Sequence, residues 1–243
     1  MSISFRSHAP RHILDAVKAA GLDCIEWGSD VHAPCDDMEK IREIVALQKE
    51  YGILCSSYGT YFRLGETPLE QLPQYIKAAK LLGTSTLRLW CGTKSGAGMT
   101  DPERAELLAA CRRAAQMAEQ SGVTLCMECH HGTLTERPED AVWLMKEVNS
   151  PRFGMYWQPF QWQDAEQNVQ NAQAIAPYTN CLHVFHWKQD KRFPLSQAVD
   201  EWRAYLAQFP MPVTLLLEFM PHDSIEELAA EAAALKSIVG DNK

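Results

Sequence analysis

The sequence lacks any apolar run of about 18 residues, the length that a helix needs to cross a bilayer. Its beginning, MSISFRSHAPRH, also lacks the charged and then apolar segments of a secretory signal, so we expect a cytoplasmic protein. Positive charge is not in excess either, because 31 Asp and Glu residues outnumber 23 Lys and Arg residues and give a net charge of −8. Since proteins that bind the phosphate backbone usually carry a clustered positive field, we expect no nucleic-acid and no membrane partner.

The spacing of a structural zinc site is absent as well. The eight cysteines are scattered over 243 residues, and most of them stand in apolar segments, where a reduced thiol behaves as a small hydrophobic side chain. The one C-x-x-C pair, Cys126 and Cys129, lies within a strand pattern, and residues three apart on a strand point to opposite faces. We therefore expect reduced cysteines and no zinc knuckle.

Linkers and low-complexity segments are also missing, and apolar runs of strand length alternate with helical patterns along the whole chain. These runs are continuous, which is typical of strands that are covered on both faces. The eight predicted strands are Ile3–Ser7, Cys24–Gly28, Ile53–Tyr58, Thr86–Cys91, Val123–His130, Phe153–Gln158, Cys181–Lys188 and Val213–Phe219. Eight such units predict the α/β class, with one (β/α)8 TIM-barrel domain over residues 1–243. A doubly wound open sheet usually has fewer units, and no G-x-G-x-x-G follows the first strand.

Polar side chains gather at the ends of the predicted strands, where TIM barrels have their active sites. Alternation along the strands predicts that Glu128, Gln158, His186 and Glu218 face the barrel mouth, whereas His183 faces the helices. Two carboxylates, one imidazole and one carboxamide oxygen suit a divalent cation such as Mn²⁺ or Mg²⁺, with Co²⁺ or Zn²⁺ also compatible. We therefore predict a metal site formed by these four residues.

Three motifs carry a family resemblance: ECH at Glu128–His130, HWKQDKR at His186–Arg192, and LLLEF with Glu218. On these motifs the chain resembles the xylose isomerase-like TIM barrels, the superfamily of sugar phosphate isomerases and epimerases that also contains endonuclease IV-type enzymes. In its ketose 3-epimerases, Glu, Asp, His and Glu on four successive strands hold the metal. The resemblance places this metal set at Glu128, Gln158, His186 and Glu218, with glutamine where the family has aspartate.

The resemblance also implies roles around the metal. Glu128 and Glu218 would be the catalytic acid and base, which remove a proton next to a carbonyl and return it through an enediolate. The residues that would bind substrate are His130, Arg88, Gln161, Lys188 and Arg192, and one or more of Trp27, Trp90, Trp157 and Trp187 could cover a sugar face. Glu26 is a candidate either for function or for an ion pair with an arginine inside the barrel.

The reaction that the resemblance implies is a metal-dependent sugar isomerisation or epimerisation. Two alternatives stay open: a lyase (dehydratase or decarboxylase) that acts on a sugar-derived acid at the same site, and a barrel that binds carbohydrate without turnover. An endonuclease IV-type activity is disfavoured, because the chain is acidic and the ligands of a trinuclear site are not evident. The expected partner is a small sugar or sugar-derived acid, and the family is compatible with a homo-oligomer.

Overall fold

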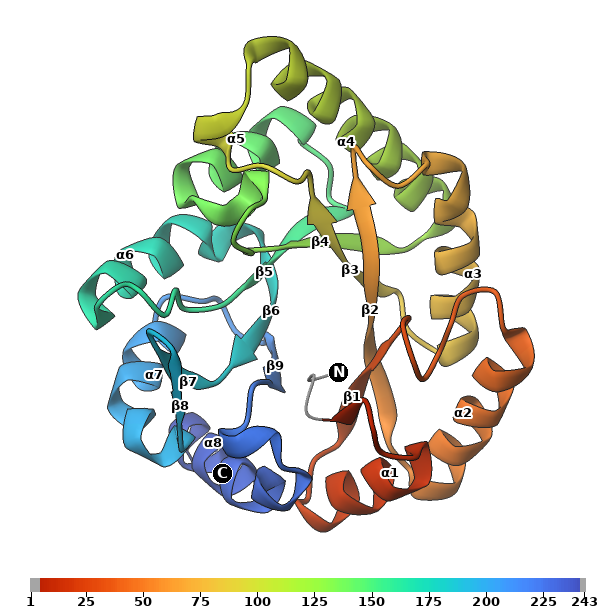
Figure 1. Cartoon of the computed structure of the whole chain (residues 1–243), viewed down its shortest axis with the longest axis vertical. Coiled ribbons are helices and arrows are strands. Elements are labelled where there is room, and N and C mark those ends of the chain that lie inside the picture. Colours follow the sequence, from red (N-terminus) through yellow and green to blue (C-terminus); the bar gives the residue numbers. More distant parts are fainter. Residues whose placement is uncertain (1–4, 241–243) are drawn as a thin grey trace.

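A computed structural model describes residues 5–240, in which parallel strands form a nearly closed barrel inside a ring of helices (Figure 1). The strands of the barrel, in their hydrogen-bonded order, are β1 (Cys24–Gly28), β2 (Leu54–Leu64), β3 (Thr86–Cys91), β4 (Thr124–Glu128), β5 (Phe153–Trp157), β6 (Thr179–Val184) and β9 (Thr214–Leu217). Every neighbouring pair in this order is parallel. The predicted α/β TIM barrel is confirmed. That residues 1–243 form one domain stays a prediction.

The described part of the chain contains eight α-helices, which surround the strands (Figure 1). They are α1 (Pro10–Ala19), α2 (Met38–Tyr51), α3 (Leu72–Leu82), α4 (Asp101–Ser121), α5 (Pro138–Val148), α6 (Ala165–Ile175), α7 (Val199–Leu206) and α8 (Leu228–Val239). Local sequence sets their limits. For example, Thr100 and Glu103 form a reciprocal capping box at the start of α4, and Gly122 ends this helix in the left-handed conformation.

The structure describes only the last three residues of the predicted strand Ile3–Ser7, and these do not form a strand. Ile3 and Ser4 lie outside the described residues, and Phe5–Ser7 form a turn in which the His8 N–H donates to the Phe5 carbonyl (3.1 Å). Over residues 5–240 the sheet therefore has seven strands, and β9 does not pair with β1. A mostly apolar cavity of about 390 Å³ lies between these two strands and reaches His183 and Glu218.

The predicted strand Cys181–Lys188 is two separate elements. The parallel strand β6 ends at Val184, and His186–Lys188 form β7, which pairs with the antiparallel strand β8 (Lys191–Phe193). Between them, Phe185 is buried and its carbonyl accepts a hydrogen bond from the Trp202 indole (2.9 Å). Because the strand breaks here, the alternation of side chains in β6 does not continue to His186.

The core has two layers, one inside the barrel and one between strands and helices. The inner layer includes a cluster formed by Cys126, Tyr156, Cys181 and Leu216. The outer layer contains the large, fully buried Trp157 and also the small Cys129. Cys126 and Cys129 thus lie in different layers, and all eight cysteines are free thiols, as the sequence predicts.

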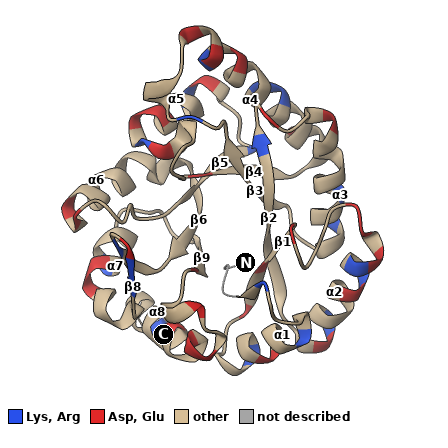
Figure 2. Ribbon diagram, viewed as in Figure 1, with Lys and Arg blue, Asp and Glu red and all other residues tan. Residues whose placement is uncertain are grey.

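Charged residues lie mainly on the helices, whereas the strands carry few (Figure 2). Among residues 5–240, no helix combines the length and the apolar character that crossing a membrane requires. The charges that are present inside the barrel therefore need a specific explanation.

Trp157 and Trp162 provide a matched test of the outer core. The Trp157 ring is fully buried and contacts the rings of Trp202, Tyr205 and Phe209, with centroids 6.0, 5.5 and 5.3 Å away, whereas Trp162 is 66% exposed. We expect Trp157→Ala to lower the free energy of unfolding by about 3–5 kcal/mol, because it leaves a cavity. Trp162→Ala should change it by less than about 0.5 kcal/mol. Urea unfolding measures both, and equal losses would contradict this description of the core.

Candidate metal centre at the barrel mouth

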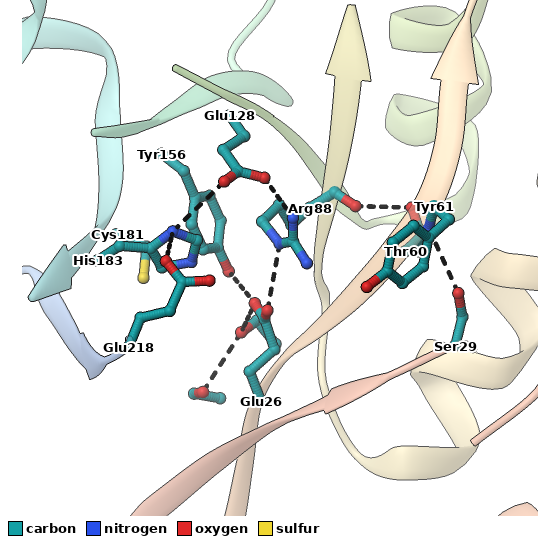
Figure 3. Close-up of polar contacts among 12 residues, drawn as sticks. Glu26, Ser29, Thr60, Tyr61, Arg88, Glu128, Tyr156, Cys181, His183 and Glu218 are labelled. Atoms are coloured by element: carbon teal, nitrogen blue, oxygen red, sulfur yellow. Dashed lines mark hydrogen bonds and ion pairs between the residues drawn. The ribbon is translucent and has the colours of Figure 1, made fainter. Parts of the chain in front are cut away.

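Three side chains from separate strands meet at the carboxyl end of the barrel (Figure 3). Glu128 is the last residue of β4, His183 precedes the last residue of β6, and Glu218 directly follows β9. Each offers one potential metal-ligand atom, and these three atoms lie within 4.8 Å of one another. Glu128 and His183 are buried, and the Glu218 side chain is 14% exposed.

Oxygens from three residues converge on one nitrogen of His183. Its Nδ1 donates a hydrogen bond to Gln158 Oε1 (2.9 Å), and it lies 3.0 Å from Glu218 Oε2 and 3.6 Å from Glu128 Oε1. Gln158 directly follows β5, so the three oxygens come from three different strand ends. Glu218 Oε2 is buried, and its close neighbour among the described residues is this His183 nitrogen. A buried carboxylate oxygen in this state suits a cation.

The charged groups of this cluster stabilise one another. Burial alone would lower the pKa of His183, but the carboxylates of Glu218 and Glu128 raise it above its ordinary value. Burial opposes ionisation of Glu128, but Arg88 and His183 hold the pKa of this carboxyl below its usual range. Arg88 lies beneath the mouth and forms ion pairs with both Glu128 and Glu26. The barrel interior therefore contains alternating acidic and basic groups.

The prediction that His183 faces outward is wrong. Cys181, two residues before it, belongs to the inner layer, whereas Leu182 and Val184 pack in the outer layer. His186 was predicted to be a metal ligand, but it lies in β7, where its Nδ1 is 3.3 Å from the Pro194 carbonyl. The structure does not bring it to the cluster of Glu128 and Glu218, because β6 ends before it.

Two of the predicted substrate-binding residues, His130 and Arg192, contact residues that neighbour this cluster. His130 stacks on Trp90 with ring centroids 4.9 Å apart, beside Glu128. Arg192 lies in β8, forms an ion pair with Asp223 and has its guanidinium carbon 4.9 Å from the centre of the Phe219 ring, next to Glu218.

Lys188, Gln161 and Arg88 are less suited to contact a substrate. Lys188 is exposed and its Nζ pairs with Glu201 on α7 (2.6 Å). The Gln161 carbonyl accepts a hydrogen bond from the Gln189 N–H (2.8 Å), which ties the loop after β5 to the β7–β8 turn. The Arg88 side chain is only 7% exposed.

The four tryptophans near strand ends have separate roles. Trp27 and Trp157 are fully buried in the outer layer, so neither is available to cover a sugar. Trp90 is partly exposed, and its Nε1 donates to Glu128 Oε2 (2.6 Å). Trp187 is partly exposed as well and packs against Phe219 with ring centroids 4.8 Å apart. Trp90 and Trp187 are therefore the two that remain candidates.

The donor set at the mouth fits a divalent metal ion. Two carboxylates, an imidazole and a carboxamide oxygen are hard or borderline ligands, which Mn²⁺ and Mg²⁺ accept. Gln158 adds an oxygen without adding negative charge.

The family model described as xylose isomerase-like TIM barrel matches residues 14–238. The chain belongs to this family. The barrel mouth described above is where TIM barrels have their active sites. No curated protein matches the chain in sequence.

Solved structures share the fold at low sequence identity. The probable 3-DHS dehydratase AsbF from Bacillus anthracis is 18% identical, with 99% of this chain and 97% of that chain covered and a TM-score of 0.79. A xylose isomerase-like TIM barrel protein from Mycobacterium smegmatis, in complex with magnesium, is 16% identical, with 96% and 90% covered and a TM-score of 0.72. D-Psicose 3-epimerase from Clostridium cellulolyticum H10, with D-tagatose, is 15% identical, with 95% and 92% covered and a TM-score of 0.70.

Arg88 provides a test of the charges inside the barrel. Arg88→Met removes the cation between two buried carboxylates, and we expect the free energy of unfolding at pH 7 to fall by about 3–5 kcal/mol. Arg11→Met breaks an ion pair with Glu50 in which both side chains are 54% exposed, and it should leave stability nearly unchanged. Urea unfolding of the metal-free proteins gives both values. An unchanged stability of Arg88→Met would show that the described pairs are not formed.

Proposed function

We propose that this protein is a divalent-metal-dependent sugar isomerase or epimerase. The observation that carries the proposal is the convergence of Glu128, His183 and Glu218, whose ligand atoms lie within 4.8 Å of one another at the barrel mouth. Two carboxylates at one mouth can hold a cation and also exchange protons with a bound substrate. The finer assignment rests on this geometry, on the family and on what its relatives bind.

Relatives of the same fold support the substrate class. Among the solved structures are D-psicose 3-epimerase with D-tagatose, a D-allulose 3-epimerase from Methylomonas sp. in complex with D-allulose, and one protein in complex with magnesium. We infer that this chain takes a small sugar or a sugar-derived acid. The cytoplasmic location and a homo-oligomeric state stay predictions.

Glu128, Gln158, His183 and Glu218 would hold the metal ion. When bound, the ion supplies positive charge that stabilises the oxygen anion of an enediolate. The chain's own residues position this charge, since their strands are fixed by the parallel sheet. His183 would bind as the neutral imidazole, so binding would release its proton.

Glu128 and Glu218 would carry the proton transfer. One carboxylate removes the proton from the carbon next to the carbonyl, and the other returns a proton. Return to the opposite face of the same carbon gives an epimer, and return to the neighbouring carbon gives an isomer. His130 and Arg192, which lie beside these two glutamates, would hold hydroxyl oxygens of the sugar.

The two histidines near the mouth test the metal site. We expect the wild-type protein to bind about one Mn²⁺ per chain. His183→Ala should raise the Kd for Mn²⁺ by about 100-fold or more, because it removes a ligand, whereas His186→Ala should leave it nearly unchanged. Titration followed by electron paramagnetic resonance of free Mn²⁺ measures both. The reverse ranking would restore His186 as the ligand, and a wild-type protein that binds no Mn²⁺ would refute the metal-dependent function.

Proton exchange tests the reaction. In D₂O with Mn²⁺, we expect a panel of ketoses and aldoses to contain a substrate that takes up deuterium next to its carbonyl, as followed by NMR. Glu218→Gln should lower this rate by about 10²–10⁴-fold, because the proton carrier is lost. Glu50→Gln, at an exposed site on α2, is the control and should keep the rate.

The same spectra separate the reaction classes. Loss of water or carbon dioxide in place of proton return would identify a lyase, the activity in the description of AsbF. Binding of a sugar without exchange would leave a carbohydrate-binding barrel.

A further inference from the structure

Arg88 joins two buried carboxylates below the candidate metal centre (Figure 3). Its Nε donates to Glu26 Oε1 at 3.2 Å, and its Nη1 donates to Glu128 Oε2. The Arg88 side chain is 7% exposed, and the Glu26 and Glu128 side chains are 4% exposed each. The guanidinium is therefore enclosed by the barrel and fixed between the two carboxylates.

Glu26 is itself fixed from its other side. Its Oε2 accepts hydrogen bonds from the Ser57 hydroxyl (2.8 Å) and the Tyr156 hydroxyl (3.0 Å). Gly59 on β2 leaves just enough room, since a Cβ at this position would lie 2.4 Å from Glu26 Oε1 and 3.0 Å from Arg88 Nη2. Glu26 is thus held by strands β1, β2 and β5 together, and Arg88 is directed by it.

The two oxygens of Glu128 have different neighbours as a result. Oε2 accepts from Arg88 and from Trp90 Nε1 (2.6 Å). Oε1 is turned to the mouth, 3.6 Å from His183 Nδ1. Two hydrogen bonds to one oxygen, one of them from the charged guanidinium, oppose rotation of the Glu128 carboxylate. Only Oε1 is therefore presented to the ligand cluster.

We propose that Glu26 and Arg88 are positioning residues of the metal centre, which hold Glu128 so that it binds the cation through Oε1 alone. This inference rests on the proposed metal-dependent function. A buried ion pair is a poor device for stability, because apolar residues of similar volume are often as stable or more stable. Fixing a metal ligand by a hydrogen-bonded group behind it is, in contrast, a general feature of metal sites.

Charge-conserving variants separate positioning from simple electrostatics. Arg88→Lys keeps the positive charge but removes the planar fork that reaches both carboxylates. Gly59→Ala changes no charge and displaces Glu26, since its methyl group needs the place of Glu26 Oε1. We expect each variant to raise the Kd for Mn²⁺ by about 10–100-fold and to change the line shape of the bound Mn²⁺ in electron paramagnetic resonance.

The controls are matched to these changes. Gly98→Ala adds a methyl group where no atom lies within 4 Å, and Glu50→Gln removes an exposed carboxylate, so both should bind Mn²⁺ like the wild type. Circular dichroism and cooperative unfolding show which variants are folded. If Arg88→Lys does not fold, the result for Gly59→Ala tests the inference. Wild-type affinity and line shape in the folded charge-conserving variants would overturn the inference while the metal site stands. A wild-type protein that binds no Mn²⁺ would overturn the proposed function and this inference with it.

Discussion

The arrangement of the barrel mouth depends on one buried cation, the guanidinium of Arg88 between Glu26 and Glu128. Without it, two carboxylates would face each other in an interior of low polarity, and one of them would have to take up a proton. With it, Glu128 stays ionised at the end of β4 and can balance the imidazole of His183. The distribution of charge in the site therefore begins one layer below the residues that would meet a ligand.

Gln158 adds no negative charge to the proposed metal site, at a position where the resemblance to ketose 3-epimerases implies an aspartate. The described cluster has two carboxylates around one imidazole, and Gln158 contributes a neutral oxygen at 2.9 Å from His183 Nδ1. Divalent cations bind less tightly as the number of charged ligands falls. The fixed orientation of the Glu128 carboxylate therefore matters more, because a metal site with few charged ligands depends more on how each ligand is placed.

Most of the fold and part of the site could be predicted from the sequence. Glu128 ends a short unbroken strand, and Gln158 and Glu218 directly follow such strands, so alternation along those strands gives their direction correctly. The run from Cys181 to Lys188 reads as one strand although it breaks at Phe185, and its pattern predicts His186 on the inner face where the structure has His183. No residue type in this run marks the inner face, since cysteines lie in both layers, Cys126 and Cys181 in the inner one and Cys129 in the outer one.

The pairing of Glu26 with Arg88 could not be predicted from one sequence, because 62 positions separate the two residues and only the sheet, in which β2 lies between β1 and β3, brings them together. The contact between Glu26 and Arg88 leaves no room for a side chain at Gly59. Any larger residue there would enter the space of the Glu26 carboxylate, so substitutions at the three positions are physically linked. Glycine at position 59 is thus part of the charge arrangement of the barrel, although it carries no charge itself.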